Sequence, residues 1–278
     1  MLIAVDGLVI RSSPSGDSDH VLQILTGSMG RLSVLIKGGK KSKKDGALAC
    51  TQLFTYANFE IYQGKDDELY WFRSASIIST YFCLTKELPA MGLAQYFCEV
   101  ASECSRDHFA EEDSEVLLRL LLNTLHSLAA GKKSPRLLKG AFEWRVASLC
   151  GFEPDLRRCA VCGAPHPQEA YLDVMNGSFI CADCQTKRNR LNATRDAAAV
   201  EEALRERRVV CPVSSSVMAA IRYTVTAPDK KLFSFVLKDP EEEYAFERAS
   251  EAFLLHHLER DFTTLHFYRS VELDWPRP

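Results

Sequence analysis

Two pairs of cysteines constrain this chain more than any other feature of its sequence. The pairs are Cys159 with Cys162 and Cys181 with Cys184, and 18 residues separate them. A C-x-x-C turn places two thiolates on one side of a tetrahedral metal ion, and a second such turn closes the other side. This spacing is typical of four-cysteine zinc sites. Residues 152–190 are therefore predicted to form a zinc-binding module.

The predicted zinc ion has a structural role. Catalytic zinc keeps one coordination position open for water or substrate, whereas four thiolates fill the shell. The metal would then hold together a segment too small to fold alone. His166 lies nearby in a Pro-His-Pro loop and is expected to be exposed rather than a ligand. The alternatives are a pair of redox-active dithiols or a site that has lost its metal.

Length and composition bound the remaining possibilities. The chain has 278 residues, 46% of them hydrophobic, and a net charge of −3. This allows one large domain or two to three small ones, and it restricts any nucleic-acid contact to a local basic patch. The chain has neither a signal peptide nor an apolar run long enough to span a membrane, so a soluble cytoplasmic protein is expected. The scattered cysteines suit a reduced core. They are Cys50, Cys83, Cys98, Cys104, Cys150 and Cys211.

The first 80 residues have the pattern of short strands. Alternating apolar residues are separated by turn clusters rich in glycine, serine and aspartate. The predicted strands cover residues 3–11, 20–26, 31–37, 53–62 and 69–78. Five short strands of this kind predict a small closed or partly closed β-barrel over residues 1–80.

After residue 80 the apolar period becomes helical. The predicted helices cover residues 93–104, 116–128, 135–149, 194–208, 214–226 and 241–260. Ser134 and Pro135 are typical of a helix N-terminus, and Gly151 is typical of its end. The sequence thus predicts an α+β multidomain protein. Its barrel is followed by a helical domain, residues 81–278, in which the zinc module is embedded.

A basic segment follows the third predicted strand. Between residues 31 and 44 the chain has six basic residues and no acidic residue. Two glycines, Gly38 and Gly39, would let the backbone approach phosphates, and the lysines would displace condensed counterions. A solvated loop explains the same charges. A nucleotide-binding P-loop is excluded, because its glycine and serine or threonine positions are not matched.

Motifs for catalysis are absent from the sequence. We find no G-x-S-x-G or H-E-x-x-H motif. The adjacent His256 and His257 lie in a predicted helix, where neighbouring side chains point about 100° apart and do not converge. No catalytic residue is predicted.

Together these features resemble the RecO family of bacterial recombination-mediator proteins. The first matching block contains G-L-V-I-R at 7–11, G-D-S-D-H at 16–20, L-T at 25–26, G-R-L-S at 30–33 and K-G at 37–38. The second contains F-E at 142–143 and L-C-G-F-E-P-D-L-R-R-C-A-V-C-G at 149–163. Order and spacing match over roughly the first 185 residues.

The resemblance implies an N-terminal OB-fold, a helical C-terminal domain with the zinc module, and no catalytic turnover. It implies a protein that binds single- and double-stranded DNA and anneals complementary strands. Such a protein helps to load the recombinase onto strands coated by single-strand-binding protein. The implied partners are RecR and the acidic C-terminal tail of the single-strand-binding protein, and the implied location is the nucleoid in the cytoplasm.

Residues at matching positions become candidate binding residues. The candidate DNA contacts are Arg11, Arg31, Lys37, Lys40, Lys41, Lys43 and Lys44. The family's loop is often rich in arginine, whereas lysines here suit phosphate contacts better than bidentate ones. The candidates for the partner tail are Arg119, Lys132, Lys133, Arg136 and Lys139, which solvated helix faces explain equally well. Two other functions stay open. One is a zinc-containing nucleic-acid enzyme with an unrecognised site. The other is a zinc-containing interaction adaptor of a repair complex with little direct DNA binding.

Overall fold

The structure, a computed structural model, describes residues 1–16, 19–37, 47–63, 69–105, 111–165, 167–193 and 210–272. The chain divides into two compact units. The first comprises Met1–Lys133 and Phe262–Pro278, and the second comprises Ser134–Asp261.

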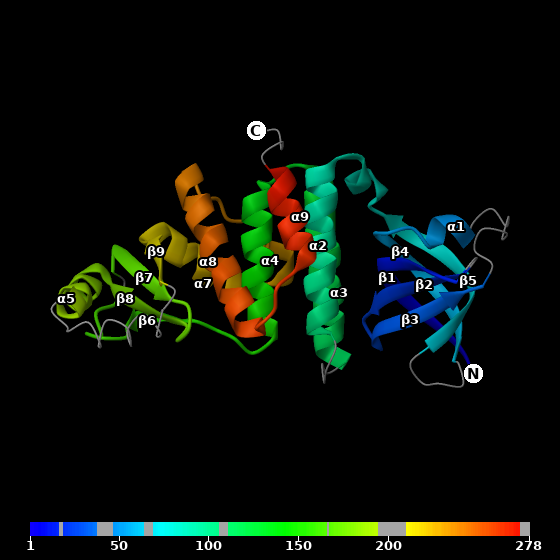
Figure 1. Cartoon of the computed structure of the whole chain (residues 1–278), viewed down its shortest axis with the longest axis horizontal. Coiled ribbons are helices and arrows are strands. Elements are labelled where there is room, and N and C mark those ends of the chain that lie inside the picture. Colours follow the sequence, from blue (N-terminus) through cyan, green and yellow to red (C-terminus); the bar gives the residue numbers. More distant parts are fainter. Residues whose placement is uncertain are drawn as a thin grey trace. The chain divides into compact units, whose positions relative to one another are not determined.

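The first unit contains a closed barrel of five strands (Figure 1). The strands are β1 (Leu2–Ser15), β2 (Asp19–Thr26), β3 (Gly30–Ile36), β4 (Thr55–Gln63) and β5 (Leu69–Thr80). Their order around the barrel is β1-β2-β3-β5-β4, and β1 also pairs with β4. The β3–β5 pair is parallel and the other pairs are antiparallel. The predicted five-stranded barrel is thus confirmed.

Alternation along the strands builds the core of the barrel. Alternate side chains of a strand face opposite sides of the sheet, so one set points into a closed barrel. The interior set includes Leu22, Ile24, Leu32, Val34 and Ile36. The residues between them on β2 and β3 point outward.

Helices complete the first unit. They are α1 (Ala47–Cys50), η1 (Phe82–Lys86), α2 (Leu88–Cys104), α3 (Glu111–Ala130) and α9 (Thr263–Val271). Helix α9 packs so closely on α2 that a Cβ at Gly92 would lie 3.1 Å from the ring of Phe267. The carboxylate of Glu99 on α2 also accepts a hydrogen bond from the backbone N–H of Thr264 at 3.1 Å. Helix α9 was not predicted from the sequence.

The second unit combines helices with a small sheet. Its helices are α4 (Pro135–Leu149), α5 (Ala182–Ala193), α7 (Ser215–Thr226), η2 (Asp229–Lys231) and α8 (Pro240–Leu258). Its strands are β6 (Asp155–Cys159), β7 (Glu169–Asp173), β8 (Ser178–Cys181) and β9 (Val210–Ser214). Helices α4 and α8 pack tightly, since a Cβ at Gly140 would lie 2.6 Å from the ring of Phe246.

Helix α4 ends where the sequence predicted. Gly151 has a φ of +85°, a conformation that glycine adopts without strain. The N–H of Phe152 donates to the carbonyl of Ala147 at 2.9 Å, which closes the turn beyond the helix. At the other end, Ser134 occupies the N-cap position, but its side chain makes no capping hydrogen bond.

Five of the predicted helices correspond to α2, α3, α4, α7 and α8, so the fold class is confirmed as a strand-rich part followed by a helical part. The helix predicted for 194–208 lies outside the described residues. Within the described part of the chain, no helix combines the length and the hydrophobicity needed to cross a membrane.

Candidate functional site

The small sheet of the second unit positions the four cysteines. Its strand order is β6-β8-β7-β9, so β6 and β8 are neighbours. Cys159 is the last residue of β6 and Cys181 the last of β8. Cys162 lies in the turn after β6, and Cys184 lies in the first turn of α5. Two strand ends and the turns that follow them therefore bring the four thiols together.

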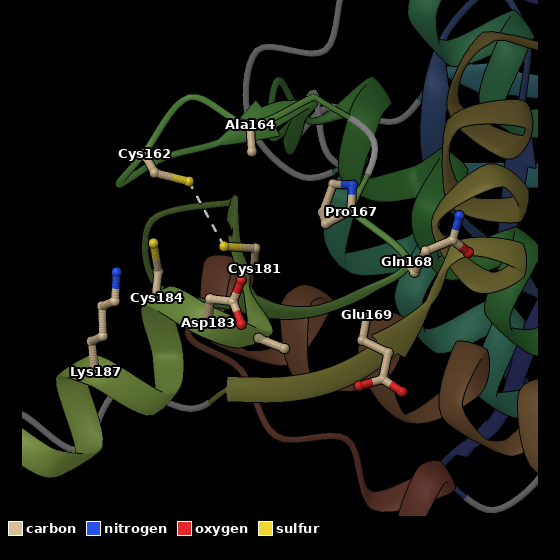
Figure 2. Close-up of a pocket in the computed structure, with 10 residues that line it drawn as sticks. Cys162, Ala164, Pro167, Gln168, Glu169, Cys181, Asp183, Cys184 and Lys187 are labelled. Carbon is tan, nitrogen blue, oxygen red and sulfur yellow. Dashed lines mark hydrogen bonds between the residues drawn. The ribbon is translucent and has the colours of Figure 1, made fainter.

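The geometry of the four thiols suits a tetrahedral metal ion. All four Sγ atoms lie within 4.8 Å of one another. The Sγ atoms of Cys162 and Cys181 are 3.8 Å apart (Figure 2). A zinc–sulfur bond of about 2.3 Å implies sulfur–sulfur edges of about 3.8 Å in a regular tetrahedron. The four predicted ligand atoms are therefore close enough together to bind one metal ion.

The backbone around Cys159 favours its thiolate, which is the form that binds metal. Its side chain is buried, and the N–H of Cys181 donates to its Sγ at 3.3 Å. Burial raises the pKa of Cys159, but hydrogen bonds from the backbone of Cys162, Cys181 and Val161 outweigh it and lower the pKa to about 6. Donors of this kind are common around anionic sulfur ligands.

A surface depression lies beside the cysteines (Figure 2). It is lined by Cys162, Ala164, Pro167, Gln168, Glu169, Cys181, Ala182, Asp183, Cys184 and Lys187. Lys187 and Asp183 lie on α5, and both are exposed. His166, which was not expected to be a ligand, lies outside the described residues.

The described candidates for DNA contact lie on the barrel. Arg11 is exposed on β1 and pairs with Gln23 of β2. Lys37 is exposed at the end of β3, and its Nζ lies 4.2 Å from the centroid of the Trp71 ring. Lys40, Lys41, Lys43 and Lys44 lie outside the described residues.

Arg31 is engaged within the first unit. Its Nη1 donates to Oγ of Ser102 at 3.1 Å and reaches the backbone oxygen of the same residue at 3.5 Å. The guanidinium thus connects the start of β3 to α2. Any contact with DNA would have to share these donors.

The candidates for the partner tail are divided between the two units. Arg119, Lys132 and Lys133 belong to the first unit, whereas Arg136 and Lys139 belong to the second. Arg119 pairs with Glu115 at 2.6 Å, and Lys132 is exposed.

Lys139 was expected on a solvated helix face or in a peptide pocket. Its side chain is instead fully buried among glutamates. Its ammonium group is therefore occupied inside the second unit.

Comparison with known families identifies the chain. Residues 1–81 match the family described as Recombination protein O N terminal, and residues 86–266 match Recombination protein O C terminal. The chain belongs to the RecO family. The resemblance found in the sequence is confirmed, and the barrel is the OB-fold of RecO N-terminal domains. The domain division at residues 80 and 81 stays a prediction.

Curated RecO proteins are similar over much of the chain. The DNA repair protein RecO of Acetivibrio thermocellus is 24% identical over 270 residues, which cover 97% of both proteins. The protein of the same name from Anaeromyxobacter dehalogenans is 32% identical over 64% of this chain and 68% of its own length. That from Anaeromyxobacter sp. strain K is 31% identical over 66% and 70%.

Trp71, which contacts Lys37, and its neighbours Tyr62 and Arg73 were not predicted from the sequence. Trp71 and Arg73 on β5 and Tyr62 on β4 lie near one another on the barrel. Strand alternation gave a partial signal, since Trp71 follows the buried Tyr70. This arrangement depends on the pairing of β5 with both β3 and β4, which the sequence did not reveal.

Proposed function

We propose that this RecO-family chain is a recombination mediator that acts in DNA repair by binding DNA. It would bind single- and double-stranded DNA, anneal complementary strands, and help to load the recombinase onto strands coated by single-strand-binding protein. RecR and the acidic C-terminal tail of the single-strand-binding protein would be its partners. Such a protein would act at the nucleoid in the cytoplasm and would carry out no catalytic step.

One observation on the barrel carries this proposal. Lys37 is exposed directly after β3, and the four lysines at 40–44 follow it in the sequence after two glycines. Arg11 adds a second cation on β1. OB-folds bind oligonucleotides on the face of their second and third strands and through the loops that join strands 1 and 2 and strands 4 and 5. A lysine-rich segment that follows the third strand in the sequence would supply the phosphate contacts that such binding needs.

The four cysteines support a structural zinc ion. Cys159, Cys162, Cys181 and Cys184 would supply the entire coordination shell, which leaves no open position. When bound, the ion would hold the ends of β6 and β8 against the start of α5. In this proposal the metal stabilises the module and takes no part in DNA binding.

The dependence of binding on salt tests the proposal. Affinity for a single-stranded oligonucleotide is measured at several salt concentrations, for the wild type and for a variant with glutamine at positions 40, 41, 43 and 44. About five phosphate contacts predict a log–log slope of roughly −3.5 for the wild type. Removal of four of them should bring the slope to about −0.7.

A matched control separates a local effect from bulk charge. Lys187, Lys230, Lys231 and Lys238 are exposed lysines of the second unit. Their replacement by glutamine removes the same charge and should leave the slope unchanged. A flat slope for the wild type, or equal slopes for the loop variant and the wild type, would contradict DNA binding through this loop. Tight RecR binding without DNA binding would instead favour the adaptor.

A further inference from the structure

Four strands place a continuous row of side chains on the outer surface of the barrel. Val21 of β2 pairs with Leu35 of β3, Leu35 with Trp71 of β5, and Trp71 with Tyr62 of β4. Paired residues lie on the same side of a sheet. Their neighbours along the strands belong to the core, as Tyr70 does, so the row faces outward. The row crosses the β3–β5 closure of the barrel.

Two aromatic rings in this row are accessible to solvent. Tyr62 is 42% exposed, and Trp71 is partly exposed. A cation lies over each ring. The Nζ of Lys37 is 4.2 Å from the centroid of Trp71, and Cζ of Arg73 is 5.9 Å from that of Tyr62. Cation–π contacts at exposed sites are weak, about 0.5–1 kcal/mol, and the exposed ion pair of Arg73 with Glu60, 3.6 Å long, is also weak, so another partner can displace these cations from the rings.

We propose that Trp71 and Tyr62 form a stacking platform for unpaired bases of single-stranded DNA. Successive bases would take the ring faces, and Lys37 and Arg73 would swing from the rings to the neighbouring phosphates. This inference rests on the proposed function and deepens it, because it names the part of DNA that the barrel reads. Exposed aromatic rings beside cations are the combination that sequence-tolerant single-strand binders use.

The surroundings of the platform favour a nucleic acid as its ligand. In the sequence, Tyr62 lies near the end of β4 and Trp71 near the start of β5, and Lys37 precedes the lysine-rich segment. The fourth-to-fifth strand connection of an OB-fold is part of its oligonucleotide surface. Bases within a duplex are stacked on each other and offer no free face. The platform therefore adds affinity for single strands and none for duplexes.

An abasic oligonucleotide separates stacking from phosphate contact. Affinity is measured for an oligothymidylate and for an abasic strand of the same length, at one salt concentration. The wild type should bind the strand with bases at least about tenfold more tightly, since each stacked base contributes about 1–3 kcal/mol and the larger ring of Trp71 should contribute more than Tyr62. Trp71→Leu should remove most of this preference and leave affinity for the abasic strand within about twofold.

Two further variants control for folding and for general hydrophobicity. Trp71→Phe keeps a stacking face and should retain much of the preference. Phe82 is 52% exposed in η1, away from the row, so Phe82→Leu should behave as the wild type. A wild type that binds both strands equally, or Trp71→Leu with an unchanged preference, would overturn the platform while DNA binding stands. A wild type that binds neither strand would overturn the proposed function and the platform together.

Discussion

The Nζ of Lys139 lies 2.9 Å from Oε1 of Glu143, one turn further along α4, and neither side chain is exposed. The same ammonium group lies 2.8 Å from Oε2 of Glu251 and 3.5 Å from Oε1 of Glu247, both on α8. Burial alone would lower the pKa of Lys139, but the three carboxylates outweigh it and raise the pKa above its ordinary value. One lysine thus neutralises acidic groups from two packed helices.

Replacement of Lys139 should destabilise the second unit. Lys139→Met leaves buried carboxylates without their counter-ion, which costs about 3–5 kcal/mol. Urea unfolding of the full chain measures this loss. Arg136→Met is a suitable control, because Arg136 is 39% exposed and lies 3.5 Å from Glu247, so its loss should cost less than about 1 kcal/mol. An unchanged unfolding midpoint for Lys139→Met would refute the structural role.

Removal of the predicted zinc should affect one unit only. The wild type should contain one equivalent of zinc, and a variant with Cys181→Ser and Cys184→Ser should contain none. Structural zinc contributes on the order of 10 kcal/mol to small modules, so the sheet around β6 and β8 should unfold. The barrel should keep its thermal transition, since its core contains no cysteine ligand.

Metal analysis and thermal unfolding together measure this effect. Serine at Cys83 and Cys211 is the control, because neither residue belongs to the four-thiol cluster. That control should keep its zinc. Retention of a full equivalent by the Cys181 and Cys184 variant would show that the cluster is not the metal site.

Arg31 and Ser102 allow a structural contact to be separated from a DNA contact. Each of the variants Arg31→Ala and Ser102→Ala removes the hydrogen bond of 3.1 Å between their side chains. Each should lower the stability of the first unit by about 1–2 kcal/mol, measured by denaturant unfolding. If Arg31 also contacts a phosphate, only Arg31→Ala should reduce the salt slope of DNA binding, by about 0.7. Equal slopes for both variants would limit Arg31 to its structural role.

His257 should make the second unit less stable in mild acid. Its ring stacks on Phe152, and its Nε2 lies 3.0 Å from the backbone oxygen of Val174. Burial, with a smaller contribution from the neighbouring His256, lowers its pKa. The unfolded chain therefore takes up a proton first, and stability falls as the pH drops through about 6.5, the ordinary histidine value.

Unfolding midpoints between about pH 8 and about pH 6 measure this dependence, because histidine titrates within this range. His257→Phe keeps the stacking and should flatten the dependence. The exposed His256 serves as the control, and His256→Gln should retain most of the slope. If the unfolding midpoint of His257→Phe depends on pH as steeply as that of the wild type, groups other than His257 cause the dependence.

Local patterns predicted much of the secondary structure. Alternation located all five strands of the barrel, because successive side chains of a strand must face opposite sides. The glycine at position 151 correctly predicted that α4 ends just before it, because the chain needs a positive φ at that point. Helix α9 was missed: it is only nine residues long and depends on its packing against α2. Short segments of this kind have little local signal of their own.

The sequence alone determined the four-cysteine cluster and the family. Both depend on C-x-x-C turns and short motifs, which can be recognised locally without knowledge of the tertiary structure. Only the tertiary structure decided the environments of Lys139 and Trp71. Lys139 has the local pattern of a solvated lysine, and its burial depends on glutamates of α8 more than 100 residues away. Trp71 meets Lys37 because β3 and β5 close the barrel. Pairing of distant segments is set by the packing of the whole core, which local periodicity does not encode.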